Sequence, residues 1–249
     1  MGTALMLLRK ALRPPAYSFD RPKEYAAVHP FDVQFGVETS GLLFAEDLPS
    51  GKRKDLYNNG YFGVAPSALR QILNRLQLDF KEFTFIDLGS GKGRALLIAS
   101  EYPFQSILGV ELSPRLHAIA EANLAAYRGT AQRCRNLRSI EADATEFPFP
   151  TGPLVIYLWN PFEAPVLTRV LANLEAALVR DSRDIYIVYI QPDLERLIEA
   201  SSHWQRLWRD EFPMSEEDYA AHAFPPRAEV CSVYRNVPGS VTTGIGLDR

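Results

Sequence analysis

The chain has 249 residues, of which 47% are hydrophobic, so it is long enough to bury a sizeable core in one large or two small domains. Its formal net charge of −3 provides no general basic surface and argues against nucleic acid as the default partner. The two cysteines and four histidines form no spacing typical of a metal site or a disulfide framework. Basic residues follow the first apolar residues instead of preceding them, and no apolar run reaches membrane-spanning length. We therefore expect a cytoplasmic protein with no secretory signal and no transmembrane segment.

Residues 1 to 60 are expected to form an N-terminal arm and lid. Residues 1 to 13 suit a short amphipathic helix with leucines on one side, and a pair of prolines stops it. We expect this helix to dock on the core or on a partner, with a membrane-surface helix as the alternative. Residues 14 to 60 mix proline, glycine and aromatic residues without sustained periodicity, which is typical of a segment that wraps a core or covers a site.

A glycine-rich turn is the most informative feature of the chain. Residues 83 to 94 read F-T-F-I-D-L-G-S-G-K-G-R, and an apolar helical run follows them. The turn therefore lies between a buried strand and a helix packed on the sheet. Gly89, Gly91 and Gly93 allow the backbone to turn sharply and to approach a ligand, beside the unpaired N–H groups of the helix N-terminus. The segment predicts a small-molecule cradle.

The spacing of this turn excludes two common phosphate-binding loops. A Walker A loop would need glycine in place of Ile86 and Ser or Thr after Lys92, and a dinucleotide fingerprint would need glycine in place of Arg94. The remaining pattern, D-x-G-x-G-x-G, begins at Asp87, and a carboxylate at this strand end suits a positively charged, phosphate-free nucleoside. We expect Lys92 and Arg94 themselves to be surface charges on the first helical turn.

Two further predicted strands end in acidic residues. One ends in Glu111, 18 residues after Gly93, near the offset at which a carboxylate binds ribose hydroxyls. The next ends in Asp143, which is suited to accept a hydrogen bond from an adenine amino group. The alternative for Asp87, Glu111 and Asp143 is an ordinary turn or helix-capping acid.

The chain from residue 61 to 235 is predicted to be one α/β domain, followed by a loose tail over residues 236–249. Helical and strand patterns alternate in it, which indicates a parallel, doubly wound sheet whose ligands bind at the carboxyl ends of the strands. Helices are predicted over 66–77, 95–99, 114–126 and 164–179, and strands over 83–86, 106–110, 138–143, 154–159 and 184–190.

Four segments in this order resemble the motifs of class I S-adenosylmethionine-dependent methyltransferases. I-D-L-G-S-G-K-G resembles motif I, G-V-E-L-S the acidic motif II and E-A-D-A-T-E-F the adenine-contacting motif III, while Y-L-W-N-P-F falls where motif IV lies. The resemblance implies a Rossmann-like, mostly parallel seven-stranded sheet with an N-terminal helical or irregular extension, in which residues 228–234 form an antiparallel edge strand. It also implies S-adenosylmethionine as the cofactor, bound by Tyr61, Ser67, Asp87, Gly89, Ser90, Gly91, Gly93, Glu111, Leu112, Asp143, Ala144 and Asn160. For Tyr61 and Ser67 the alternatives are packing and helix capping.

Asn160, Pro161 and Phe162 are the predicted catalytic residues. They resemble the (N/D)-P-P-(Y/F) motif of amino-group methyltransferases with one proline instead of two. The resemblance implies that carbonyl groups of Asn160 and Pro161 accept hydrogen bonds from an acceptor N–H while Phe162 stacks on the acceptor. The alternative is a strand-terminating Asn-Pro turn with a core phenylalanine.

We therefore expect a methyltransferase that acts by in-line displacement on a nitrogen acceptor in preference to oxygen, on a small molecule or a protein side chain. One rival is an aminopropyl-type transferase, for which Glu216, Glu217 and Asp218 are the only candidate polyamine-binding acids. The other is a non-catalytic module that keeps the cofactor fold for binding or assembly.

Overall fold

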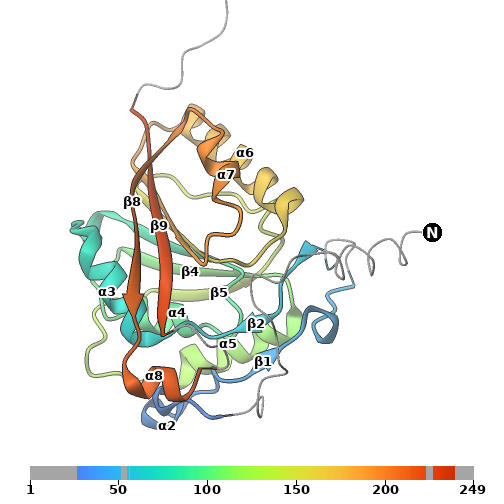
Figure 1. Cartoon of the computed structure of the whole chain (residues 1–249), viewed down its shortest axis with the longest axis vertical. Coiled ribbons are helices and arrows are strands. Elements are labelled where there is room, and N and C mark those ends of the chain that lie inside the picture. The colour runs from blue at the N-terminus through green and yellow to red at the C-terminus, as the bar shows by residue number, and fades with distance from the viewer. Residues whose placement is uncertain (1–26, 52–54, 56, 223–226, 239–249) are drawn as a thin grey trace, which may run out of the picture.

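The computed structural model describes residues 27–51, 55, 57–222 and 227–238. The helix predicted over residues 1 to 13 lies outside this range, as does most of the predicted tail. The centre of the molecule is a seven-stranded sheet with the strand order β5-β4-β3-β6-β7-β9-β8 (Figure 1). Its strands are β3 (Thr84–Leu88), β4 (Ser106–Glu111), β5 (Leu137–Glu141), β6 (Leu154–Trp159), β7 (Ile185–Ile190), β8 (Trp204–Pro213) and β9 (Ala228–Asn236).

Five of these strands are parallel and two are antiparallel. β3 to β7 run in the same direction, and β9 lies antiparallel between β7 and β8. From β3 the chain first adds strands on one side and then, from β6, on the other, so the strand order reverses between β3 and β6. Ligands of open α/β sheets bind beyond the carboxyl ends of the strands at such a reversal. The predicted seven-stranded, doubly wound class I methyltransferase fold is confirmed.

Helices cover both faces of the sheet (Figure 1). α3 (Pro66–Leu76) and α4 (Arg94–Ala99) pack on one face, α6 (Ala164–Arg180) and α7 (Glu195–Glu199) on the other, and α5 (Pro114–Ala126) lies against β4 and β5. Ser113 caps α5, and Pro114 occupies its first turn, as predicted. The remaining helices are α2 (Pro30–Phe35), α8 (Glu216–Ala220), η1 (Ala45–Asp47) and η3 (Phe80–Glu82). No helix in the described ranges is long and apolar enough to cross a membrane.

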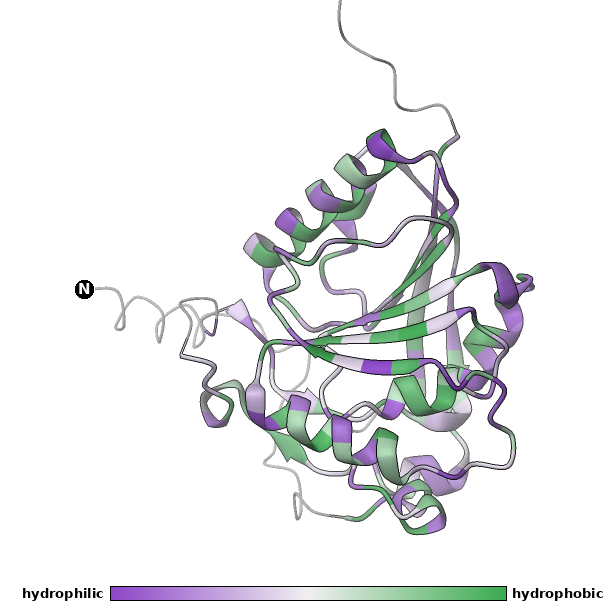
Figure 2. Ribbon diagram, turned by 180° about the vertical axis from the view of Figure 1, so that it is seen from behind, coloured by the Kyte–Doolittle hydropathy of each residue, from purple (hydrophilic) through white to green (hydrophobic). Residues whose placement is uncertain are grey.

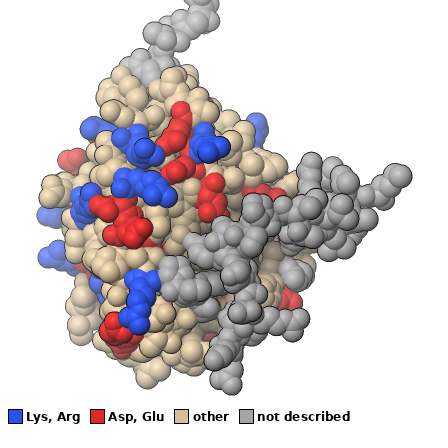
Figure 3. Space-filling model, in the orientation of Figure 1, with Lys and Arg blue, Asp and Glu red and all other residues tan. Residues whose placement is uncertain are grey.

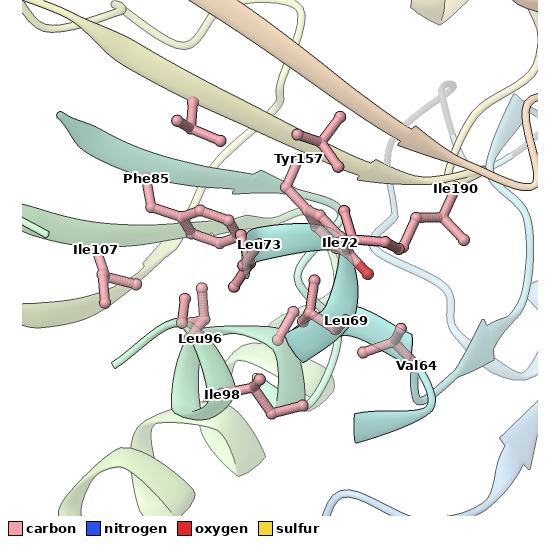
Figure 4. Packing of buried hydrophobic residues seen from close by; sticks show 14 of the residues in the cluster. Val64, Leu69, Ile72, Leu73, Phe85, Leu96, Ile98, Ile107, Tyr157 and Ile190 are labelled. Carbon is pink, nitrogen blue, oxygen red and sulfur yellow. The ribbon is translucent and has the colours of Figure 1, made fainter. Parts of the chain in front are cut away.

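The central strands β3, β4, β6 and β7 are buried on both faces, as their continuous apolar runs predict. In Figure 2 the central strands are mostly hydrophobic, whereas the helices around them mix hydrophobic and hydrophilic residues. In Figure 4 the side chains of Leu69 and Ile72 from α3 and Leu96 from α4 approach Phe85 of β3. Each of these four residues is fully buried, which contributes about 1.5 to 3 kcal/mol per side chain. The core therefore holds the carboxyl ends of the strands in fixed positions.

The described part of the arm packs beside this edge of the sheet. β1 (Leu42–Leu43) and β2 (Tyr61–Phe62) form an antiparallel pair, and α2 precedes them in the chain (Figure 1). His29 caps α2 by accepting a hydrogen bond from the Phe31 N–H.

The C-terminal hairpin differs from the prediction. β9 is antiparallel as expected, but the edge of the sheet is β8, which was not predicted. Trp204 and Phe212 are the only buried residues of β8, so its sequence shows no apolar alternation. Basic and acidic side chains are interspersed on the face where β8 and α7 lie (Figure 3), and Arg206 and Arg209 pair with glutamates there. Such charges protect an edge strand from pairing with another chain.

Candidate functional site

A cavity lies at the carboxyl ends of β3, β4, β5 and β6, where the fold predicts a ligand site. It encloses about 1020 Å³ between atoms, including the open solvent at its mouth. The structure brings together most of the predicted site residues around it: Tyr61, Asp87, Gly89, Ser90, Gly91, Glu111, Leu112, Asp143, Ala144, Pro161 and Phe162. Three predicted residues, Ser67, Gly93 and Asn160, do not line it.

The glycine turn has the backbone conformation that its sequence predicts. Gly89 and Gly91 have φ angles of +81° and +54°, which side-chain-bearing residues rarely adopt. A Cβ atom on Gly89 would lie 2.6 Å from Cβ of Pro161, and one on Gly91 would lie 2.2 Å from the Tyr61 ring. The two glycines therefore make room for neighbouring side chains of the cavity wall as well as for a ligand. Gly93 instead precedes α4 as its N-cap.

Glu111 connects the first two strand ends of the cavity. Its Oε2 accepts a hydrogen bond from the Gly91 N–H and its Oε1 accepts one from the Ser113 N–H, both at 2.8 Å. Burial raises the pKa of Glu111, and the backbone N–H donors of Ser113, Gly91 and Leu112 oppose that shift. The carboxylate thus lies between the glycine turn and the end of β4, in the position from which a ribose would be contacted.

Asp87 and two hydroxyl groups provide unsatisfied polar groups in the cavity wall. Burial, and then the negative charge of Glu111, raises the pKa of Asp87 well above its usual value. The buried hydroxyls of Ser90 and Tyr157 have no hydrogen-bond partner among the described residues. Buried polar groups of this kind are costly unless a ligand or water satisfies them. A polar ligand that carries positive charge fits this wall, which agrees with the prediction from the sequence.

Asp143 combines a structural contact with a position in the cavity. It follows β5 by two residues, and its Oδ1 accepts hydrogen bonds from the backbone N–H and the hydroxyl of Thr145, at 2.8 and 2.7 Å. The turn-acid alternative is therefore present in the structure. Asp143 and Ala144 also line the cavity beside Glu111, so a ligand contact is compatible with this turn.

Lys92 and Arg94 correct the prediction that they are surface charges. They are only 6% and 4% exposed, because the arm covers them. Lys92 Nζ donates to Glu38 Oε1 at 3.0 Å and to the Ser40 carbonyl at 2.8 Å, while Arg94 Nε donates to Thr39 Oγ1 at 2.7 Å. These partners lie more than 50 residues earlier in the chain, so no local pattern identifies them.

Tyr61 belongs to the same arm contact. Its hydroxyl donates to the Thr39 carbonyl at 2.6 Å, and its ring packs over Gly91. Burial raises its pKa. The packing alternative for Tyr61 is therefore present, and the residue also lines the cavity.

Ser67 and the acidic cluster of α8 interact with each other, away from the cavity. The Ser67 N–H donates to Asp218 Oδ2 at 2.7 Å, and its hydroxyl accepts from the Ser215 N–H at 2.8 Å. Asp218 also lies 3.2 Å from His29, and Glu216 pairs with Arg227. The structure thus assigns Ser67 to the junction of α3 and α8, and none of the acids proposed for a polyamine lines the cavity.

The Asn160-Pro161-Phe162 segment follows directly after β6, and only its last two residues line the cavity. Asn160 has a φ of +40°, and its side chain turns toward β7, where it accepts from the Tyr189 hydroxyl at 3.0 Å and donates to Asp193 at 2.8 Å. The backbone carbonyls of Asn160 and Pro161 accept from the Asn59 side chain and backbone N–H, at 2.6 and 3.0 Å. The Asn160 side-chain carbonyl and the Pro161 backbone carbonyl, which were assigned to the acceptor, are therefore contacted by Tyr189 and by Asn59, a residue that sequence reasoning missed.

Glu229 is a second residue that sequence reasoning missed. It is fully buried in β9, and burial raises its pKa. Its carboxylate accepts from the Trp159 indole N–H at 3.2 Å and from the Gln191 side chain at 2.9 Å. Trp159 lines the cavity, so Glu229 orients part of its wall from behind. The sequence signal that could have identified Glu229 is an acidic residue within the otherwise mostly apolar strand A-E-V-C-S-V-Y.

Comparison of the sequence with protein-family models gives one match. The model of the histone methylation protein DOT1 family matches residues 52–139, which include the glycine turn, Glu111 and the start of β5. The resemblance to class I S-adenosylmethionine-dependent methyltransferases is confirmed. The match also supports S-adenosylmethionine as the cofactor, because it spans the residues that form the cradle. No curated protein matches the sequence.

Solved structures with a similar arrangement include several methyltransferases. The glycopeptide N-methyltransferase MtfA in complex with S-adenosylmethionine is 13% identical, with a TM-score of 0.49 over 72% of this chain and 96% of that one. NodS, an N-methyltransferase from Bradyrhizobium japonicum WM9, is 10% identical, with a TM-score of 0.46 over 67% and 86%. The ribosomal protein L11 methylase from Lactobacillus delbrueckii subsp. bulgaricus is 16% identical, with a TM-score of 0.46 over 68% and 77%. Since these scores lie below 0.5, the fold assignment rests on the strand order described above.

Proposed function

We propose that this protein transfers the methyl group of S-adenosylmethionine to a nitrogen acceptor. The observation that carries the proposal is the convergence of the glycine turn, Glu111 and Asp143 from three adjacent strand ends on one cavity. Glu111 would accept hydrogen bonds from the ribose, and Asp143 would accept one from the adenine amino group. Leu112 and Ala144 would line the same nucleoside pocket, and Gly89, Ser90 and Gly91 would contact the remainder of the cofactor.

Bound S-adenosylmethionine supplies a methyl group on a positively charged sulfur. A nucleophile that attacks the methyl carbon in line with the C–S bond takes the methyl group, and the neutral thioether leaves. The chain's own residues would position the acceptor, which can supply a large part of the rate acceleration. Asp87, a buried carboxylate with no hydrogen-bond partner among the described residues, would stabilise positive charge in the cradle. Tyr61 would close the cradle over Gly91, where its ring already packs.

The acceptor would bind beside Pro161 and Phe162. The Pro161 carbonyl accepts a hydrogen bond from the Asn59 backbone N–H, but a carbonyl oxygen has two lone pairs and can accept a second N–H. Nitrogen is favoured over oxygen because a neutral amine attacks through a free lone pair, whereas a hydroxyl needs a general base. Among the described residues that line the cavity there is no histidine or lysine to serve as that base. Of the acids that line it, Asp87, Glu111 and Asp143 are assigned to the cofactor in this proposal, and Asp55 accepts hydrogen bonds from the N–H groups of Ser50 and Gly51.

Calorimetry followed by a turnover assay tests the proposal. We expect the purified protein to bind S-adenosylmethionine and S-adenosylhomocysteine, and to transfer a labelled methyl group to members of amine, peptide or metabolite pools. A product stable to alkali and methylated on nitrogen supports the proposal, whereas an alkali-labile methyl ester or a methyl ether overturns the nitrogen assignment. Binding without turnover against any pool supports the non-catalytic alternative. We also propose a cytoplasmic location, which suits two buried, unbridged cysteines.

A further inference from the structure

Arg94 is the only basic residue among the described residues that line the cavity. Four acids line the same cavity: Asp55, Asp87, Glu111 and Asp143. S-adenosylmethionine carries two positive groups, its sulfonium and its ammonium, and one negative group, its carboxylate. A cavity with several acids and a single guanidinium is complementary to this distribution of charge, provided that the guanidinium meets the carboxylate.

The arm holds the Arg94 guanidinium in place through Thr39, Ser40 and a buried ion pair with Asp32. Nε and Nη2 donate to the hydroxyl and the carbonyl of Thr39, at 2.7 and 3.0 Å, and Nη2 lies 3.3 Å from the Ser40 hydroxyl. The nearest carboxylate, Asp32, is 3.8 Å from Nη2 and accepts its hydrogen bonds from Thr39 and Ser40 instead. Asp32 therefore offsets part of the guanidinium charge from the side of Nη2, whereas no ion pair involves Nη1 among the described residues.

The Nη1 group is the part of Arg94 with donor capacity left. Nη1 has two N–H bonds, and among the described residues it donates one hydrogen bond, to the Val64 carbonyl at 3.4 Å. It also lies against Gly63, where a Cβ atom would come within 2.6 Å of Nη1. Both Gly63 and Val64 line the cavity, so Nη1 lies in its wall.

The order of the strands places Arg94 at the appropriate end of the cavity. Glu111 and Asp143, the residues proposed for the nucleoside, lie at the ends of β4 and β5. Arg94 instead comes after β3, at the start of α4, and lies against Gly63 and Val64 of the segment that follows β2. The amino-acid part of the cofactor extends away from the nucleoside, and therefore from the β5 side toward β3 and β6. On this basis, which rests on the proposed function, we infer that Arg94 binds the carboxylate of the methionine part of the cofactor.

Two ligands that differ only in this carboxylate test the inference by calorimetry. They are S-adenosylhomocysteine and its decarboxylated analogue, which retains the adenine, ribose, sulfur and amine. We expect the wild-type protein to bind S-adenosylhomocysteine about 10- to 100-fold more tightly than the analogue, the range for a hydrogen bond to a charged group. Arg94→Met should abolish this preference by weakening only the binding of S-adenosylhomocysteine. Equal affinities in the wild type, or an unchanged preference in Arg94→Met, would overturn the inference.

Lys92→Met is the matched control, because Lys92 holds the same arm loop through Glu38 and Ser40 without lining the cavity. We expect it to keep the preference for the carboxylate, and a preference lost equally in both variants would assign the effect to the loop.

If Arg94→Met does not fold, Arg94→Lys should reduce the preference several-fold, since an ammonium cannot bind a carboxylate through two parallel donors. An unchanged preference in that variant contradicts the inference. Failure of the wild type to bind either ligand would overturn the proposed function itself.

Discussion

The two halves of the cavity are built from contacts of very different range. In the half formed by β3, β4 and β5, Glu111 binds Gly91 and Ser113, which lie 20 and 2 residues away, and Asp143 binds Thr145. In the half formed by β6 and the arm, Asn160 is held by Asn59, 101 residues away, and Trp159 by Glu229, 70 residues away. The first half is thus a set of local motifs, whereas the second is assembled by the tertiary fold.

This difference explains what the sequence predicted. Glu111, Asp87 and the glycine turn carry their signal in residue type and spacing alone. The structure places Glu111, Asp87, Gly89 and Gly91 in the cavity wall and Gly93 at the N-cap of α4. Lys92 and Arg94 were misassigned because their burial depends on an arm that has no periodic pattern of its own. The strands β3, β4, β6 and β7 followed from their apolar runs, while β8 did not, because its many charged residues conceal any alternation.

In the half of the cavity formed by β3, β4 and β5, we expect the largest effect from a substitution of Gly91. Gly91→Ala combines a positive φ with a Cβ atom 2.2 Å from the Tyr61 ring, so we expect loss of measurable S-adenosylhomocysteine binding and displacement of Tyr61. Gly152→Ala is the matched control, since its φ is +83° but nothing lies within 4 Å of the added Cβ. It should cost about 1 to 2 kcal/mol of stability and leave binding unchanged. Calorimetry and thermal unfolding of both variants test this, and normal binding by Gly91→Ala would mean that the cradle is misassigned.

Glu111 tests whether the same half binds the ribose. Glu111→Ala should weaken S-adenosylhomocysteine binding by about 1.5 to 3 kcal/mol, because it removes a charged hydrogen-bond acceptor. Glu141, the exposed residue paired with Glu111 in the sheet register, offers a control at the same strand ends. Glu141→Ala should bind normally in calorimetry. Unchanged affinity in folded Glu111→Ala would rule out the ribose contact.

Asp87 separates cofactor binding from stability. Burial raises the pKa of Asp87 in the folded protein, so its contribution to stability is fully present below the usual pKa near 3.8 and is lost as the pH rises through the raised value. Asp87→Asn should therefore stabilise the ligand-free protein at neutral pH, with little difference in acid, while weakening the binding of the cationic cofactor about tenfold. Thermal unfolding across pH, together with calorimetry, measures both effects. A variant that is destabilised at neutral pH would show that Asp87 is a structural acid.

Asn160 belongs to the long-range half, where we expect the smallest effect on the cofactor. If the segment it begins positions the acceptor, Asn160→Ala should leave the affinity for S-adenosylmethionine within a few-fold while lowering turnover about 10²-fold, as small misplacements of reacting groups do.

Two further variants serve as controls for Asn160→Ala. Part of any loss of stability will come from the Asn160 φ of +40°, which Asn160→Gly relieves. Tyr189→Phe removes only the hydroxyl that donates to Asn160 Oδ1 and leaves the backbone unchanged. If all three variants lose turnover without losing the cofactor, the orientation of the Asn160 side chain serves the acceptor. Equal loss of cofactor affinity and turnover would instead mean that the two halves form one structural unit.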